Sequence, residues 1–256
     1  FIFEQDSYLI RFNSMKGFGR YMIFLGSLVV RRESLGTYYK LVLEECILVG
    51  VKSLFLFALV STFIGAVTTV QTAYNLVSPL VPNYIISNVV REMTILELAP
   101  TIMALIFAGK VGSSMSGNLG TMRITEQIDA LEVMGINATS YLVLPKIIAS
   151  ILMYPMLVIF SGACALGGGY LVGTLTGIIS PTDYIYGLRY AFNEYTVTFA
   201  LTKALVFGFL ISSISCFKGY YTKGGAFEVG VASTEAVTTS VMAVLIADYL
   251  LAQLLL

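Results

Sequence analysis

Five stretches of this chain are each apolar over the length that a helix needs to cross a lipid bilayer. They cover roughly residues 46–72, 93–115, 141–175, 195–217 and 232–256. A spanning helix takes about 20 mostly apolar residues. Only 12% of the chain is charged, against about 25% in soluble domains. The sequence therefore predicts an all-α polytopic membrane protein with five transmembrane helices. The third stretch is long enough to tilt or break, and it contains Pro145 and Pro155.

The N-terminal region has a different pattern. Residues 8–33 interleave apolar side chains with five basic ones, Arg11, Lys16, Arg20, Arg31 and Arg32. This composition is typical of an amphipathic helix that lies in the headgroup plane. A sixth spanning helix is the alternative, but Arg11, Lys16 and Arg20 interrupt any 20-residue window. We expect an interfacial amphipathic helix region over 1–40 and a transmembrane domain over 41–256.

Basic residues in the loops predict the orientation, because cytoplasmic loops are enriched in Lys and Arg. They are concentrated in the N-terminal region and in loops 110–146 and 218–231. Loops 73–92 and 176–194, on the other side, offer only Arg91 and Arg189. The N-terminus is therefore expected in the cytoplasm and the C-terminus outside.

Residues 97–136 contain the most distinctive feature. An apolar helix carrying Glu97 is expected to run into a Gly/Ser-rich break, followed by a short cytoplasmic amphipathic helix at about 121–135, between the second and third spans. That helix has an apolar stripe and an acidic band, made of Ile124, Ile128 and Leu131, and of Glu126, Asp129 and Glu132. An apolar face with carboxylates at its edge can dock in a groove on a soluble partner. Rest on the membrane is the alternative, which the anionic inner leaflet disfavours.

Three charged residues lie within the spans, where charges are costly and face a partner or a cavity. Lys203 and Asp248 have opposite signs and similar depths on sequential antiparallel helices. We predict that they form an ion pair with a mainly structural role, with a transport role as the alternative. Glu97 has no obvious partner in its own helix, so we expect it to face a cavity or a polar neighbour.

Several classes of function are disfavoured. The chain has no His, and Cys46, Cys164 and Cys216 are far apart in apolar runs, so we expect no metal site and no disulfide. The GKVGSS segment at 109–114 has Ala104 and Val111 where a phosphate-binding loop needs Gly and Ser or Thr. The net charge of zero gives no electrostatic case for nucleic acid. We therefore expect a non-catalytic chain.

Small residues recur every four positions in the third span. They are Ser161, Ala165, Gly169, Gly173 and Gly177. Small residues at this spacing let helix backbones approach closely in lipid. They predict a helix-packing face, within the chain or between copies.

Several segments together carry a family resemblance. They are FIGAVTTVQ (63–71), ELAPTIMALIFAGKVGSSMSGNLGTMRITEQIDALEVMGI (97–136), PKIIA (145–149), GGGYLVG (167–173) and KGYYT (218–222). With them the chain, from about 40 to 256, resembles the MlaE/YrbE family of permease subunits of phospholipid ABC transporters, which work with MCE-domain proteins.

The resemblance implies a homodimer in a bacterial inner membrane. Two ATPase subunits would bind its cytoplasmic face, and a ring of MCE-domain protein would sit on the periplasmic face. No cofactor is implied on this chain, because ATP is bound by the ATPase. The segment 121–135 would be the coupling helix, with Glu126, Asp129 and Glu132 facing the ATPase.

The resemblance also implies a lipid cavity between the two copies. The positions that match its lining are Thr68, Gln71, Leu76, Glu97 and Leu98, and Lys203 and Asp248 match charged family positions. Two positions depart from the family pattern: Leu96 stands where members often have Arg, and Asn118 where they commonly have Glu.

Two other functions remain open from the residues. A self-sufficient secondary transporter of lipid or a small molecule would usually show inverted repeats and broken helices, and five spans do not divide into equal halves. A membrane scaffold for a partner complex would have no use for costly buried charges.

Overall fold

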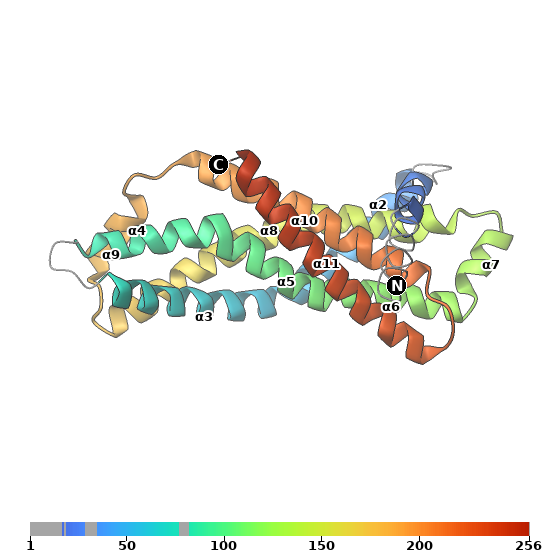
Figure 1. Ribbon diagram of the computed structural model, residues 1–256, viewed down its shortest axis with the longest axis horizontal. Coiled ribbons are helices and arrows are strands. Elements are labelled where there is room, and N and C mark those ends of the chain that lie inside the picture. The colour runs from blue at the N-terminus through green and yellow to red at the C-terminus, as the bar shows by residue number, and fades with distance from the viewer. Residues whose placement is uncertain (1–16, 18, 29–34, 77–81, 256) are drawn as a thin grey trace, which may run out of the picture.

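The computed structural model describes residues 17, 19–28, 35–76 and 82–255, and within them it is helical without strands. Five helices are long and apolar enough to span a membrane, which confirms the predicted fold class. They are Tyr38–Asn75, Tyr84–Ile124, Ala138–Leu175, Glu194–Tyr220 and Ala226–Leu255. They form one elongated bundle (Figure 1).

The first two spans are built from shorter helical pieces. The first span begins within α2 (Leu35–Cys46) and continues through the π-helical η1 (Ile47–Val51) and α3 (Lys52–Asn75). The second contains α4 (Tyr84–Met93), η2 (Thr94–Ile102), α5 (Met103–Phe107), η3 (Ala108–Gly112) and α6 (Ser113–Ile124).

The rest of the chain supplies α7 (Gln127–Val133), α8 (Ala138–Leu175), α9 (Pro181–Arg189), α10 (Glu194–Tyr220) and α11 (Ala226–Leu255). Short helices close the bundle at both ends (Figure 1). We call these the α7 end, which also holds the C-terminal part of α6, and the α9 end, where α4 lies against α9.

The expected Gly/Ser-rich break does not exist. Residues 112–120 continue the second span as helix, and the chain turns only at Thr125 and Glu126, where Glu126 has a left-handed φ of 60°. The glycines serve packing instead, because small residues let helices approach in lipid. A Cβ on Gly112 would lie 2.8 Å from the Ser215 hydroxyl of α10. The helix after the turn is also shorter than predicted, at 7 residues.

The third span is a single unbroken helix despite its two prolines. Its small-residue face packs along α3. Ser161, Ala165, Gly169 and Gly173 are buried, which confirms the packing prediction for them. Gly177 instead lies in the turn after the helix and is exposed.

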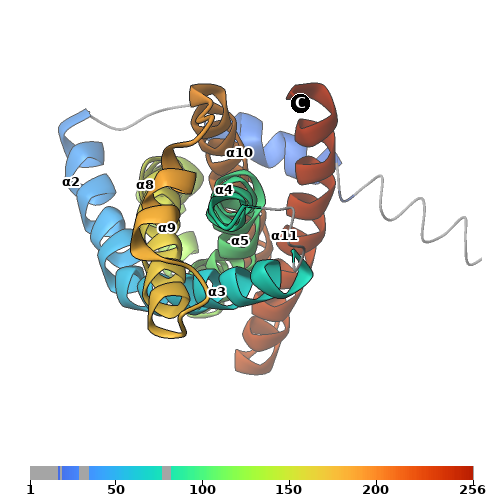
Figure 2. The ribbon, with the colours of Figure 1, turned by 90° about the vertical axis from the view of Figure 1, so that its left-hand side faces the viewer.

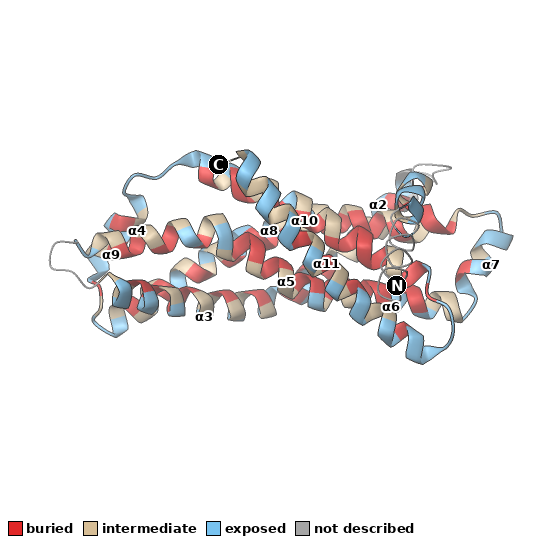
Figure 3. Cartoon of the chain, viewed as in Figure 1, coloured by how far each residue is buried: buried red, intermediate tan, exposed pale blue. Residues whose placement is uncertain are grey.

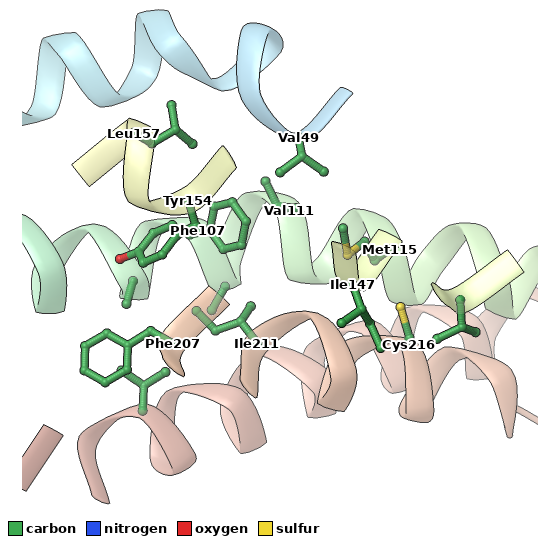
Figure 4. Packing of buried hydrophobic residues seen from close by; sticks show 14 of the residues in the cluster. Val49, Phe107, Val111, Met115, Ile147, Tyr154, Leu157, Phe207, Ile211 and Cys216 are labelled. Carbon is green, nitrogen blue, oxygen red and sulfur yellow. The ribbon is translucent and has the colours of Figure 1, made fainter. Parts of the chain in front are cut away.

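The core runs along the bundle between the spans, as the buried residues show in Figure 3. Near its centre Phe107 of the second span meets Tyr154 of α8, with ring centroids 4.7 Å apart (Figure 4). The Tyr154 hydroxyl donates to the Pro100 carbonyl at 2.6 Å. Cys216 is buried in this core, and the three cysteines are free.

The N-terminal segment 19–27 is helical and lies across the direction of the bundle (Figure 2). Phe24 is buried against the rings of Phe217 and Tyr220 of α10. The Tyr21 hydroxyl hydrogen-bonds to Ser213 at 2.7 Å, and burial raises the pKa of Tyr21 above its usual value. Most of the predicted 1–40 region, including Arg11 and Lys16, lies outside the described residues.

Candidate functional site

Three charged side chains from three spans meet within the bundle. The Lys203 ammonium on α10 lies 2.6 Å from Asp248 on α11 and 2.8 Å from Glu97 in η2. The Lys203 side chain is 1% exposed, Asp248 is 14% exposed and Glu97 is 50% exposed. The structure therefore brings the predicted pair together and adds Glu97 to it. We call these residues the charge triad.

A backbone carbonyl also contacts the ammonium group, in a segment that contains Pro100. It is the carbonyl of Leu96. Lys203 donates to that carbonyl at 3.3 Å. The surrounding segment is π-helical, a distortion that is frequent at functional sites.

The triad joins three elements and leaves one carboxylate accessible. Thr101 donates to Asp248 at 3.2 Å, and the Lys203 ammonium lies 4.8 Å from the centre of the Phe199 ring. One buried cation faces two carboxylates, so the formal charge of the triad is −1. Since Lys203 and Asp248 are enclosed, Glu97 is the member that a ligand or a second chain can reach.

The other predicted substrate residues are spread over the α9 half of the first two spans. Gln71 of α3 is exposed and lines two open surface hollows, one with Ala66, Val67, Val70 and Val172, the other with Val70, Tyr74 and Asn75. The Thr68 hydroxyl donates to the Ile64 carbonyl. Leu76 packs against the small cluster around Tyr184, and Leu98 is half-buried. Neither hollow includes Glu97.

The chain itself takes up much of the apolar face predicted to dock in a partner. Ile128 is fully buried in the chain's own core, and Leu131 is partly buried against that core. Both therefore hold α7 to the bundle, and Ile128 leaves no surface that could enter a groove on a partner. Ile124 is half-buried at the end of α6.

The acidic residues of this segment are exposed but not all free. Asp129 pairs with Arg123 at 2.7 Å, and Glu132 accepts a hydrogen bond from the Tyr220 hydroxyl at 2.9 Å. Glu126 is exposed at the turn.

The apolar tip of α7 was not predicted from the sequence pattern. Val133 is 90% exposed and Met134 is 65% exposed. Both lie outside the apolar stripe at i, i+4 and i+7. The sequence signal that could have indicated them is the pair of adjacent apolar residues directly after Glu132. Exposed apolar patches rimmed by polar groups are typical of interaction surfaces, so this pair is a candidate contact.

No group of His, Cys, Asp or Glu able to hold a metal ion is found within the described residues. The candidate site consists of two separate parts. One is the charge triad among the spans. The other is the α7 surface at one end of the bundle, formed by the exposed Glu126, Asp129, Glu132, Val133 and Met134.

One family model and several known proteins are similar to this chain along most of its length. The model, described as Permease MlaE, matches residues 42–254. A probable ABC transporter permease protein of Rickettsia bellii is 38% identical over 217 residues, 85% of this chain and 83% of the relative. One of Synechocystis is 35% identical over 213 residues, 83% and 81% of the two chains. The chloroplastic protein trigalactosyldiacylglycerol 1 of Arabidopsis thaliana is 33% identical over 229 residues, 90% of this chain and 65% of that protein.

Proposed function

This chain belongs to the MlaE permease family and is the permease component of an ABC transporter, and we propose that it moves phospholipid between the inner membrane and a periplasmic MCE-domain protein. The observation that carries the lipid proposal is a half-exposed carboxylate, Glu97, held by Lys203 on spans whose outer surface exposes apolar residues such as Met93, Val67 and Val70. Such a surface suits an amphiphile, because apolar walls take acyl chains while a polar group meets the headgroup. The Arabidopsis relative bears the name of a glycerolipid.

The proposed cavity needs a second copy of the chain. Within one chain the hollows at Gln71 are open, and Val67, Val70 and Tyr74 of α3 are exposed. In the last span, α11, only 11% of the residues in an apolar 18-residue window are buried, so much of its surface is free to meet another copy. A homodimer would close these surfaces into one chamber with Glu97 from each copy.

The α7 surface is the proposed contact with two ATPase subunits. Because Ile128 fixes α7 to the core, force applied at Val133 and Met134 would be transmitted to the spans. In this mechanism ATP hydrolysis on the partner drives the dimer between an open cavity and a collapsed one. Lipid is thereby passed to or received from the MCE ring.

Purification from native membranes through a tag on this chain, with mass spectrometry of proteins and lipids, tests the proposal. The variant Val133→Glu/Met134→Glu should lose the ATPase and keep phospholipid. Leu175→Glu is the matched control, since it changes an exposed apolar residue of α8 far from α7. It should retain the ATPase.

Three results would count against the proposal. An ATPase that binds the α7 variant equally well would place the docking surface elsewhere. A chain that purifies with its partners but without phospholipid would favour a scaffold. Transport that continues without any ATPase would favour the secondary transporter.

A further inference from the structure

A second polar site lies in the half of the bundle nearer α7, away from the charge triad. It is a pocket of about 250 Å³ between the first, second and third spans. Its polar lining includes Lys52, Lys110, Lys146, Glu45 and Ser53. We call it the lysine pocket.

The charges in the lysine pocket do not balance. Lys146 is buried and pairs with Glu45. Lys110 donates to the backbone carbonyl of Lys52, which leaves its charge without a carboxylate. Neither Lys52 nor Lys110 has an ion pair with any described residue. Three cations against one anion give the pocket a formal charge of +2.

A buried hydroxyl without a hydrogen-bond partner is evidence for a ligand at this pocket. Ser53 lines the pocket and is fully buried, and its Oγ has no hydrogen-bond partner in the structure. A buried polar group without a partner is costly. An anionic oxygen at this position would accept from Ser53 and neutralise the lysines.

Ser114 and Asn118 add further polar groups, and the apolar part of the lining is Leu48, Val49, Val111 and Met115. Val49 and Val111 face each other across the two spans in Figure 4. The volume is below that of a typical pocket for a drug-sized ligand, so the pocket has room for a headgroup but not for a whole lipid.

We propose that the lysine pocket binds a negatively charged phosphate group, carried by an anionic phospholipid headgroup or by free phosphate. This site is separate from the proposed transport cavity and rests on its own charges and lining. In the predicted orientation it lies in the cytoplasmic half of the membrane, where the leaflet is anionic.

The absence of Trp from the chain allows a direct test. Leu48→Trp places one fluorophore at the lysine pocket, in the full chain reconstituted in vesicles. Quenching is measured with brominated phosphatidylglycerol and with brominated phosphatidylcholine. We expect phosphatidylglycerol to bind more tightly, because each lysine near an anionic headgroup contributes about fivefold.

The test variant is Lys52→Gln/Lys110→Gln, which keeps hydrogen-bond donors and changes no core residue. In this variant the ratio of phosphatidylglycerol to phosphatidylcholine affinity should fall by about fivefold or more. The control Lys40→Gln/Lys223→Gln removes the same charge at exposed positions outside the pocket and should keep the preference. Circular dichroism checks that both variants are folded.

Each outcome decides the proposal. Relief of quenching by added inorganic phosphate would support the site and assign it to the free anion. Stronger quenching by phosphatidylglycerol that phosphate leaves unchanged would assign it to the lipid. Equal quenching by both lipids without any effect of phosphate would overturn it, since the lysines would then only extend toward the headgroups. No quenching by either lipid, together with no change in tryptophan fluorescence on adding phosphate, would also overturn it, because the pocket would then bind neither source of the anion.

Discussion

Lys203 connects three spans through one ammonium group. It contacts two carboxylates and the Leu96 carbonyl. Removing one partner of a buried ion pair leaves an uncompensated charge, which costs about 3–5 kcal/mol. The two carboxylates are not equivalent, however, because Glu97 is half-exposed and Asp248 is mostly buried. The structural and functional roles of the triad can therefore be separated.

We predict that Lys203→Met destabilises the chain by about 3–5 kcal/mol, because two carboxylates are left facing each other. Glu97→Gln should leave the Lys203–Asp248 pair intact, keep the fold, and lower the amount of co-purified phospholipid. Thermal unfolding with a thiol-reactive dye provides the measurement, since Cys216 is buried in the folded chain.

The double variant Lys203→Met/Asp248→Asn is the control for this prediction. It leaves only the half-exposed Glu97 charged, so it should recover much of the stability lost in Lys203→Met. If the two variants are equally unstable, packing around Lys203 is responsible instead of charge.

The sequence predicted only part of the triad. Sequential antiparallel helices are expected to be neighbours, so matched depth was enough to pair Lys203 with Asp248. Glu97 lies on the second span, and its contact with the fourth depends on tertiary packing that depth along one helix does not specify. Similarly, the apolar stripe of Ile128 and Leu131 predicted a buried face but could not say that the chain itself buries it.

At the scale of elements, glycine sets the distance between α3 and α8. A Cβ on Gly65 would lie 1.8 Å from the Ala165 carbonyl oxygen, and one on Gly168 would lie 2.2 Å from that of Thr62. Both contacts are with backbone, which cannot move aside as a side chain can. The sequence indicated the α8 face from its four-residue repeat, but the partner helix and Gly65 followed only from the structure. In α6, glycines that would favour a break in a water-exposed helix instead pack inside the bundle.

We predict that Gly65→Ala separates α3 from α8 and destabilises the chain by about 1–3 kcal/mol, as overpacking does elsewhere. Gly167→Ala is the matched control, because nothing lies within 4 Å of the Cβ that it adds to α8. The midpoint of thermal unfolding should fall in the first variant and stay level or rise in the second. Equal midpoints would mean that the two helices have room to adjust.

At the scale of the whole molecule, the helices are longer than a membrane is thick. The 38 residues of α8 extend about 57 Å at 1.5 Å per residue, whereas the hydrocarbon core is about 30 Å thick. Hydropathy locates the most apolar part of each span, which is why all five predicted segments are shorter than the helices. The bundle must therefore project into water, and the exposed polar residues around α7 make that end a candidate for the projection.

The orientation of the bundle yields the last prediction. The end of α11 lies beside the start of α10, where the Tyr195 hydroxyl donates to the Leu255 carbonyl, so the C-terminal end of α11 is on the α9 side. The basic loops predict that the α7 end is cytoplasmic.

In a variant with Cys46, Cys164 and Cys216 replaced by Ala, a membrane-impermeant maleimide should label Phe192→Cys in spheroplasts. It should label Gln127→Cys only after permeabilisation, since an intact membrane would shield α7. Labelling of Gln127→Cys alone in intact spheroplasts would mean that the orientation is reversed. It would then contradict both the proposed ATPase contact at α7 and the position of the lysine pocket in the cytoplasmic leaflet.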